Sequence, residues 1–387
     1  CYEKKMSIFT LSQKINLAKN VIVKRPIYVQ FYITSRCNLA CEQCSIIHAD
    51  AKHQEMNIEQ INRVAENLKK IGVTIVLLIG GEPFVRKDIS QIVKAFTSRN
   101  IHVRMQTNGV ASTKQLEECV KAGGKDISIS LDTLDPSVQD KINGGFNKSW
   151  ERAINTISKV TEIFPEKSTA FFNSVIMPRN LKHIKNVIKF ATEIGWGVSL
   201  VPVHFTAPTH PLPYRTIDYD GLMNFTDVTE DEINNFILEI KEMKKNYNLY
   251  DSDEYLDDVA RFILKKPTNW RNKNSNICDS PNLYFAIAPS GLIKVCCDFE
   301  IDQRHYIYDD DFPEKFNNKV IHDDIYKVTN GCEGCMYGSY PEVTITARYL
   351  SAFIERLKYF NFKTPKLKKF STNELRDIAT SILNEQA

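Results

Sequence analysis

The sequence predicts an α/β fold whose first half is a partial (β/α)6 TIM-like barrel. Apolar segments typical of strands alternate with amphipathic helical segments from Ile27 to Val203. One of these segments, Val73–Ile79, is a continuous apolar run, as expected for a strand buried on both faces of a parallel sheet. Alternating strands and helices imply parallel strands joined by right-handed crossovers. Because six such units are too few to close an eight-stranded barrel, we expect an open one.

The expected elements follow one another in strand–helix order. Strands are expected at Ile27–Thr34, Val73–Ile79, Ile101–Gln106, Asp126–Leu131, Thr169–Met177 and Val198–Val203. Helices are expected between them at Asn57–Ile71, Asp88–Arg99, Gln115–Ala122, Ser149–Val160 and Asn180–Ile194. In sheets of this kind chemistry gathers at the carboxyl ends of the strands, so the side chains that follow each strand are the first candidates for a site.

Beyond Val203 the alternation stops. Here we expect helices at Thr229–Tyr247, Ser252–Leu264, Ile345–Tyr359 and Asn373–Leu383, and a β-hairpin formed by Leu283–Ala288 and Leu292–Cys297. The chain is therefore divided into an N-terminal extension (1–26), the partial barrel (27–210), a helical linker (211–275), a small hairpin-and-helix domain (276–345) and a C-terminal helical tail (346–387).

The composition excludes several classes of protein. The chain has 387 residues, of which 43% are hydrophobic and 25% charged, and its net charge of +3 indicates neither nucleic acid nor an acidic membrane surface as a partner. No apolar run approaches the roughly 20 residues that span a bilayer, and no signal-peptide h-region is present, so we expect a cytoplasmic location. Ten cysteines in such a chain indicate metal binding rather than disulfides.

Three cysteines, Cys37, Cys41 and Cys44, follow the first strand directly. Thiolates hold iron–sulfur clusters, and closely spaced cysteines on one loop can wrap a cubane of four irons. Three ligands leave one iron open to a substrate-like molecule, which distinguishes a catalytic cluster from a closed electron-transfer cluster. A structural zinc site and a set of buried thiols are the alternatives, although zinc sites usually show paired Cys-x-x-Cys halves.

This Cys-x-x-x-Cys-x-x-Cys loop resembles the signature of the radical S-adenosylmethionine (radical SAM) superfamily, and the resemblance extends from Ile27 to Val203. It implies that the three cysteines bind a [4Fe–4S] cluster whose fourth iron is chelated by S-adenosylmethionine. It further implies homolysis to a 5′-deoxyadenosyl radical, hydrogen abstraction from a substrate C–H bond, and a flavodoxin- or ferredoxin-like low-potential electron donor. The sequence departs from the family at Gln43, where an aromatic residue is common.

A Gly-Gly-Glu-Pro motif, formed by Gly80, Gly81, Glu82 and Pro83, ends the second strand. Two glycines let the backbone approach a ligand closely, and the carboxylate of Glu82 suits an ammonium group. The motif resembles the one that holds the amino group of S-adenosylmethionine in the radical SAM family. The alternative interpretation is a simple turn.

Other strand ends supply further candidates for cofactor contacts. Asn108, in Thr107-Asn108-Gly109, resembles the family's Thr-Asn-Gly turn. Ser130 and Asp132 are placed to bond ribose hydroxyls, as similar residues do in the family, and Asn173 on the fifth strand is another candidate contact. A plain turn and solvated polar side chains are the alternatives.

A second group of cysteines comprises Cys278, Cys296, Cys332 and Cys335. The hairpin brings the first two together, and the Cys-x-x-Cys pair completes four ligands, a spacing that also permits zinc. The arrangement resembles the SPASM extension of radical SAM enzymes and, because no cysteine follows Cys335, its shorter twitch form, which implies one auxiliary [4Fe–4S] cluster. Cys297 is left over as an alternative ligand, a hydrogen-atom donor or a buried thiol.

The two resemblances together imply an oxidoreductase-type radical SAM enzyme whose auxiliary cluster aids substrate oxidation or binding. Dehydrogenation, epimerisation or cross-linking of a sugar-like small molecule or a peptide would fit. The loop from His204 to Gly221 is expected to border the pocket, and the short segment before Ile27 leaves no room for a leader-peptide-binding domain. An adenosyl-transfer enzyme and a non-catalytic zinc or iron–sulfur protein are the alternatives.

Overall fold

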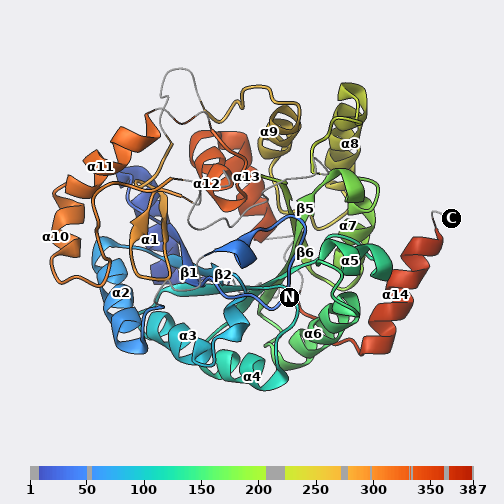
Figure 1. The fold of residues 1–387 in the computed structure, drawn as a ribbon, viewed down its shortest axis with the longest axis horizontal. Helices are drawn as coiled ribbons and strands as arrows, with labels where there is room; N and C mark the ends of the chain where they lie inside the picture. Colours follow the sequence, from blue (N-terminus) through green and yellow to red (C-terminus); the bar gives the residue numbers. More distant parts are fainter. Residues whose placement is uncertain are drawn as a thin grey trace, which may run out of the picture.

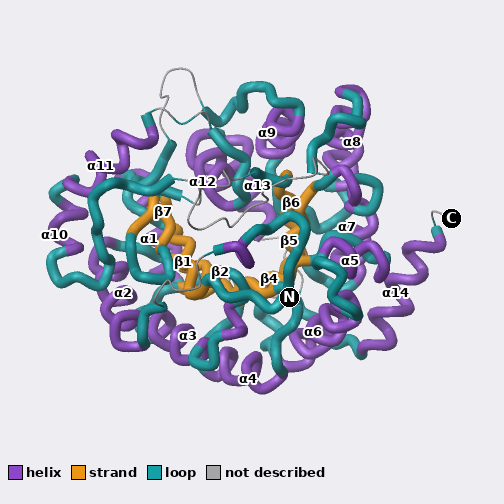
Figure 2. The backbone as a smooth tube through the Cα atoms, viewed as in Figure 1, coloured by secondary structure: helices purple, strands orange, loops and turns teal. Residues whose placement is uncertain are grey.

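A curved eight-stranded sheet lies at the centre of the molecule (Figures 1 and 2). The computed structural model describes residues 8–49, 55–205, 223–271, 278–296, 299–330, 332, 334–360 and 366–385. The strands are β1 (Tyr28–Thr34), β2 (Ile75–Gly80), β3 (His102–Thr107), β4 (Asp126–Ser130), β5 (Thr169–Ile176), β6 (Gly197–Pro202), β7 (Tyr284–Ile287) and β8 (Ile293–Lys294). Their order across the sheet is β6-β5-β4-β3-β2-β1-β7-β8.

Strands β1 to β6 are parallel, which confirms the predicted α/β partial barrel. The predicted hairpin is also present, as the antiparallel pair β7 and β8. Strand β7 pairs in parallel with β1, from Tyr28 opposite Tyr284 to Phe31 opposite Ile287. The hairpin therefore extends the barrel sheet, and the division of the chain at residue 276 stays a prediction about folding units.

Helices surround the convex face of the sheet, as Figure 1 shows for α2, α3, α4, α6 and α7. The helices of the described residues are α1 (Leu11–Val23), α2 (Ile58–Ile71), α3 (Ile89–Thr97), α4 (Thr113–Lys121), α5 (Pro136–Ile142), α6 (Ser149–Ile163), α7 (Ile184–Glu193), α8 (Glu230–Met243), α9 (Asp253–Ile263), α10 (Phe312–Asn317), α11 (Val320–Thr329), α12 (Ser339–Arg348), α13 (Leu350–Lys358) and α14 (Thr372–Asn384). None of them is long and apolar enough to cross a membrane.

Some helices differ from the predicted set. Helix α1 was not predicted, although Thr10 and Gln13 form a capping box at its start. The segment expected as one helix from Ile345 to Tyr359 is two, because Tyr349 adopts an extended conformation between α12 and α13. The short helices α5, α10 and α11 were also not predicted.

The two faces of the sheet differ in composition. On β1, Val29, Phe31 and Ile33 are fully buried in the large core beneath the helices. The intervening Tyr28 and Tyr32 belong to a second apolar cluster on the concave face. At the amino end of the sheet the rings of Phe9 and Phe360, with centroids 5.9 Å apart, and of Tyr250 and Tyr359, 5.3 Å apart, pack together. This packing fills that end, so the opposite, carboxyl end is the one that carries the candidate site.

Candidate functional site

The first cysteine loop follows β1 and brings its three thiols close together. Cys37, Cys41 and Cys44 are all half-buried. Burial, followed by the neighbouring Cys44 and Cys37, raises the pKa of the Cys41 thiol well above its usual value. Burial likewise raises the pKa of Cys44 to about 12. Three neighbouring thiols on one loop are a donor set that fits an iron–sulfur cluster, whose positive irons would hold them as thiolates.

The loop is held by residues that follow α5, a contact that the sequence analysis missed. The thiol of Cys41 donates to Asn143 Oδ1 at 3.5 Å, and the amide of Glu42 donates to the carbonyl of Ile142 at 2.8 Å. Gly144 has φ of +77°, and a Cβ built there would lie 2.1 Å from the carbonyl oxygen of Ala40. The Asn-Gly-Gly sequence after α5 was the available signal, because it permits this close backbone approach.

The Gly-Gly-Glu-Pro motif packs directly against the cysteine loop. The amide of Gly81 donates to the carbonyl of Thr34 at 2.9 Å, and the amide of Glu82 donates to that of Arg36 at 2.8 Å. A Cβ at Gly80 or Gly81 would lie 2.2 Å from one of those same oxygens. The two glycines thus allow one backbone segment to approach another, and their contact with a ligand stays a prediction.

Glu82 is a buried carboxylate, only 1% exposed, within a set of donors. Its Oε1 accepts from the amide of Phe84 and from Thr107 Oγ1, both at 2.9 Å, and its Oε2 accepts from the amide of Asn108 at 2.7 Å. Burial raises the pKa of Glu82 to about 7, although these donors lower it. A cation bound beside Glu82 would stabilise the ionised form.

Asn108 joins three of the predicted site elements. Its backbone amide donates a hydrogen bond to Glu82. Its side-chain Nδ2 donates to Asn38 Oδ1 at 2.7 Å and lies 3.9 Å from Cys37 Sγ. The Thr-Asn-Gly turn therefore connects the end of β3 to both the carboxylate and the cysteine loop.

Asp132, which follows β4, is also buried and 1% exposed. It accepts from the amide of Val175 at 2.7 Å and from Gln43 Nε2 at 3.2 Å. Burial raises the pKa of Asp132 to about 7. Gln43, the residue at which the sequence departs from the family, thus ties the cysteine loop to β4 through a hydrogen bond that the sequence analysis did not foresee.

Ser130 and Asn173 lie opposite each other in register on β4 and β5. Asn173 Nδ2 donates to Gln106 Oε1 at 3.0 Å and to Ser128 Oγ at 3.2 Å. Asn173 thus links β5 to β3 and β4, and the contact of Ser130 and Asn173 with a cofactor stays a prediction.

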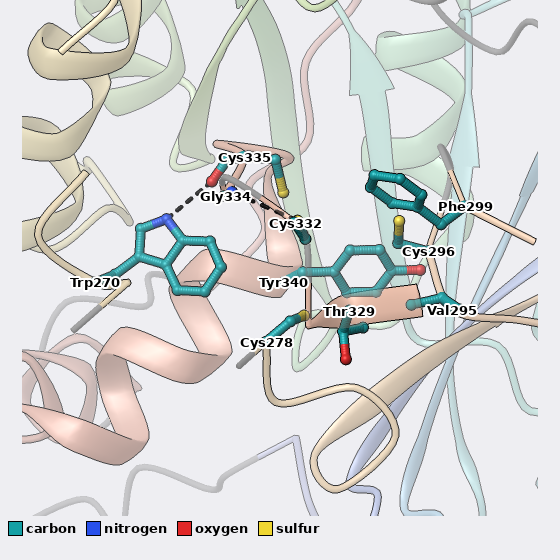
Figure 3. A pocket seen from close by; sticks show the side chains of 10 residues that line it. All are labelled: Trp270, Cys278, Val295, Cys296, Phe299, Thr329, Cys332, Gly334, Cys335 and Tyr340. Carbon is teal, nitrogen blue, oxygen red and sulfur yellow. Dashed lines mark hydrogen bonds between the residues drawn. The ribbon is translucent and has the colours of Figure 1, made fainter. Parts of the chain in front are cut away.

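The four cysteines of the second group line one pocket, although they come from three separate segments (Figure 3). Cys278 precedes β7, Cys296 follows β8, and Cys332 and Cys335 lie between α11 and α12. The rest of the lining is mainly apolar and includes Trp270, Val295, Phe299, Thr329, Gly334 and Tyr340. Neither this group nor the first cysteine loop has three side chains already arranged to hold a metal ion, and the same holds for the other His, Cys, Asp and Glu side chains among the described residues.

The two cysteine groups share a wall. Cys37 and Cys44 of the first group, and Cys278 and Cys296 of the second, pack against the same apolar cluster on the concave face of the sheet. That cluster comprises Tyr28, Tyr32, Ile46, Leu77, Ile79, Leu283, Tyr284, Ala286 and Tyr340. Cysteines of both sites therefore border one packed cluster.

His204 and Phe205 are the described part of the loop that was expected to border the pocket, and His204 makes defined contacts. It is buried; its Nδ1 lies 2.7 Å from the carbonyl oxygen of Pro202, and its Nε2 accepts from the amide of Met336 at 3.1 Å. It thus connects the end of β6 to the Cys332–Cys335 segment. Cys297 and residues 206–222 lie outside the described residues.

An open barrel of parallel strands, with three cysteines after β1 and a buried glutamate after β2, defines a class of α/β proteins built to hold an iron–sulfur cluster at the carboxyl end of the sheet. Residues 31–191 match the family model described as the Radical SAM superfamily. This segment, which is less than half of the chain, is similar to a superfamily whose members use a [4Fe–4S] cluster and S-adenosylmethionine.

Several relatives are named GTP 3′,8-cyclase or probable GTP 3′,8-cyclase. The probable GTP 3′,8-cyclase of Methanocaldococcus jannaschii is 31% identical over 165 residues, which cover 42% of this chain and 54% of that protein. The GTP 3′,8-cyclase of Rhizobium etli is 25% identical over 284 residues, which cover 70% of this chain and 74% of that protein. The chain spans about half the length of the first of these relatives.

Among solved structures, the chain is similar to SuiB of Streptococcus suis bound to the precursor peptide SuiA. The TM-score is 0.59 at 18% sequence identity, over 93% of this chain and 79% of that one. This likeness shows the fold.

Proposed function

We propose that the protein is a radical SAM oxidoreductase with two cysteine-bound clusters. Cys37, Cys41 and Cys44 hold the catalytic [4Fe–4S] cluster, and Cys278, Cys296, Cys332 and Cys335 hold an auxiliary one. The observation that carries this proposal is the convergence of four cysteines from three segments on one pocket that shares a wall with the catalytic loop. Four separately placed thiols are what an auxiliary cubane requires.

The polar groups at the carboxyl end of the sheet have distinct roles in this proposal. Glu82 receives the ammonium group of S-adenosylmethionine, because it is a buried carboxylate beside the cysteine loop. Asn108 holds Glu82 and the cysteine loop in place relative to each other. Ser130, Asp132 and Asn173 contact the nucleoside part of the cofactor. The bound cluster and cofactor supply a 5′-deoxyadenosyl radical when an external flavodoxin- or ferredoxin-like donor provides the electron.

The residues of the chain keep this chemistry apart from water. The concave-face cluster contains Tyr32, Tyr284 and Tyr340, each no more than 1% exposed. Packed aromatic rings at the amino end of the sheet close the opposite side. A substrate that enters at the carboxyl end therefore meets both cysteine sites across an apolar layer, where reactive species are shielded from solvent.

A peptide is the substrate class that we favour. The fold of SuiB, which was solved with its precursor peptide, is similar over 93% of this chain. A nucleotide is the second candidate, because the similarity to the GTP 3′,8-cyclase of Rhizobium etli extends over 284 residues.

The test is release of 5′-deoxyadenosine by the anaerobically reconstituted protein in the presence of cell extract. One portion of the extract is digested with protease beforehand and a second portion is treated with phosphatase. We expect stimulation of 5′-deoxyadenosine release that protease removes and phosphatase leaves. Loss on phosphatase treatment alone would identify a nucleotide, and no release from any portion would contradict the enzyme assignment.

The mass of the modified substrate separates oxidation from adenosyl transfer. An oxidised product lacks two hydrogen atoms relative to the substrate, because the abstracted hydrogen leaves with 5′-deoxyadenosine and a second proton and electron are lost. A product heavier by the deoxyadenosyl group, with no free 5′-deoxyadenosine, would instead show adenosyl transfer.

A further inference from the structure

Tyr284, on β7, contacts one of the cysteines of the second group through its hydroxyl. Its side chain is fully buried, and its Oη lies 3.2 Å from Cys278 Sγ. The same oxygen lies 3.0 Å from Thr344 Oγ1, on α12. The three groups form a short hydrogen-bonded chain that ends on a candidate ligand.

The protonation state of a metal-bound cysteine determines which group donates in each of these hydrogen bonds. A cysteine that binds a metal is a thiolate and can only accept hydrogen bonds, whereas a tyrosine hydroxyl has one proton to donate. When Cys278 is a ligand, Tyr284 must therefore donate to its sulfur, and Tyr284 in turn accepts from Thr344. The hydroxyl of Thr344 thereby favours the orientation that serves Cys278.

The ring of Tyr284 is held by aromatic stacking, and its backbone is held by strand pairing. It stacks on Tyr340, with centroids 4.7 Å apart, and Tyr340 stacks on Tyr337, with centroids 6.1 Å apart. The hydroxyl of Tyr337 lies 3.1 Å from that of Tyr32 on β1. The backbone of Tyr284 is also held in register opposite Tyr28 in the sheet. The hydroxyl is therefore held at Cys278 by the barrel sheet as well as by its own segment.

We infer that Tyr284 is a positioning residue of the second cysteine site, which holds the Cys278 thiolate by a hydrogen bond anchored in the barrel. This inference rests on the proposed function, since it requires Cys278 to be a ligand. Outer-shell partners of ligands raise metal affinity, and hydrogen bonds to cluster sulfurs raise the reduction potential.

The test compares Tyr284→Phe with the parent as the full reconstituted chain. Tyr284→Phe should release metal from the second site to a chelator about 10–100-fold faster, as typical for loss of an outer-shell partner. Its second cluster should also titrate at a lower potential, followed by electron paramagnetic resonance. Equal release rates and an unchanged potential would overturn the inference.

Tyr28→Phe is the matched control. It removes a buried tyrosine hydroxyl from the same apolar cluster, one that donates to Ser339 Oγ on α12 at 2.9 Å, from the residue opposite Tyr284 in the sheet. It should leave metal release unchanged, and equal acceleration in both variants would reduce the effect to general packing and overturn the inference.

Thr344→Val carries the test if Tyr284→Phe does not assemble, because it keeps the tyrosine and removes the group that orients its proton. It should accelerate metal release less than Tyr284→Phe does. An unchanged release rate in Thr344→Val would contradict the hydrogen-bonded series Thr344–Tyr284–Cys278. If the parent protein holds zinc at the second site, the auxiliary cluster is contradicted, but metal release still tests the role of Tyr284. If the parent protein holds no metal at the second site, both the auxiliary cluster and the role of Tyr284 are overturned.

Discussion

The two cysteine sites are assembled in different ways. The first takes its three thiols from one loop, Cys37 to Cys44, which follows β1 and is held by a few backbone contacts with the ends of β2 and α5. The second takes its four thiols from segments before β7, after β8 and between α11 and α12. A local site depends on the conformation of its loop, whereas a site built from distant segments depends on the packing of the whole sheet edge.

The second site is also joined to the barrel sheet through a strand pairing. Because β7 pairs with β1, the strand that leads into the catalytic loop also supports the auxiliary pocket. Changes confined to the auxiliary thiols should therefore be distinguishable from changes that disturb the shared wall.

The largest effect is expected at the local site. Replacement of Cys37, Cys41 or Cys44 with Ala should abolish release of 5′-deoxyadenosine, because two thiolates cannot hold the catalytic cubane. Cys119→Ala, in a buried position on α4 remote from both groups, is the control and should retain release. Parental release from any of the three loop variants would remove that cysteine from the ligand set.

The second effect should separate the sites. Replacing Cys278, Cys296, Cys332 and Cys335 together with Ala should lower the iron content from about eight to about four per chain, as expected for the loss of one cubane. Cleavage of S-adenosylmethionine should persist and oxidation of the substrate should stop. Circular dichroism serves as the control for folding, and a folded variant that still holds about eight irons would contradict the ligand assignment.

Gly81→Ala tests how the local site is closed. A Cβ there would lie 2.2 Å from the carbonyl oxygen of Arg36, so the two backbones must separate. Overpacking of this kind typically costs about 1–3 kcal/mol, and the cofactor-free variant should therefore melt at a lower temperature. An unchanged melting temperature with weaker cofactor binding would mean that the glycine serves ligand approach alone.

Glu82→Gln should weaken S-adenosylmethionine binding by about tenfold or more, as expected for losing a charge-assisted hydrogen bond of roughly 1.5–3 kcal/mol. Because burial raises the pKa of Glu82 to about 7 and the ammonium needs the ionised form, parental affinity should rise as the pH increases towards about 7 and then level off. The variant should lack this rise, measured by calorimetry. The surface change Glu118→Gln should leave both the affinity and its pH profile intact. A parental pH profile in Glu82→Gln would contradict the assignment of Glu82 as the partner of the ammonium group.

Ser130→Ala should have the smallest effect. Loss of one neutral hydrogen bond to the cofactor costs about 0.5–1.5 kcal/mol, which corresponds to a roughly two- to tenfold weaker affinity. Calorimetric titration with S-adenosylmethionine measures this change, and an affinity equal to the parent's would exclude Ser130 from the cofactor contacts.

The barrel could be predicted because segments typical of strands alternate regularly with amphipathic helical segments, and several of the strands end in a distinctive polar motif. The local site could be predicted for a similar reason, since its ligands are neighbours in the sequence. Helix α1 gave no such signal: it buries the polar Gln13 and Asn20, which donate to backbone carbonyls, and exposes Leu11 and Ile15. Its residue pattern is therefore the reverse of an ordinary amphipathic helix.

The contacts between distant segments could not be predicted from spacing. Nothing in the residues of β7 indicates that β1 is its partner, because the register of an edge pair depends on tertiary packing. The bonds of Gln43 to Asp132 and of Tyr284 to Cys278 arise from the same assembly. Sequence reasoning named the second cysteine group through its resemblance to a known arrangement, and the shared wall emerged only from the structure.

Metal analysis of the anaerobically purified parent tests the central claim most directly. Two cubanes, one in each cysteine site, predict about eight irons per chain and no zinc. Four irons with one zinc would show that the second pocket is a structural zinc site, and the oxidoreductase proposal would lose its main support.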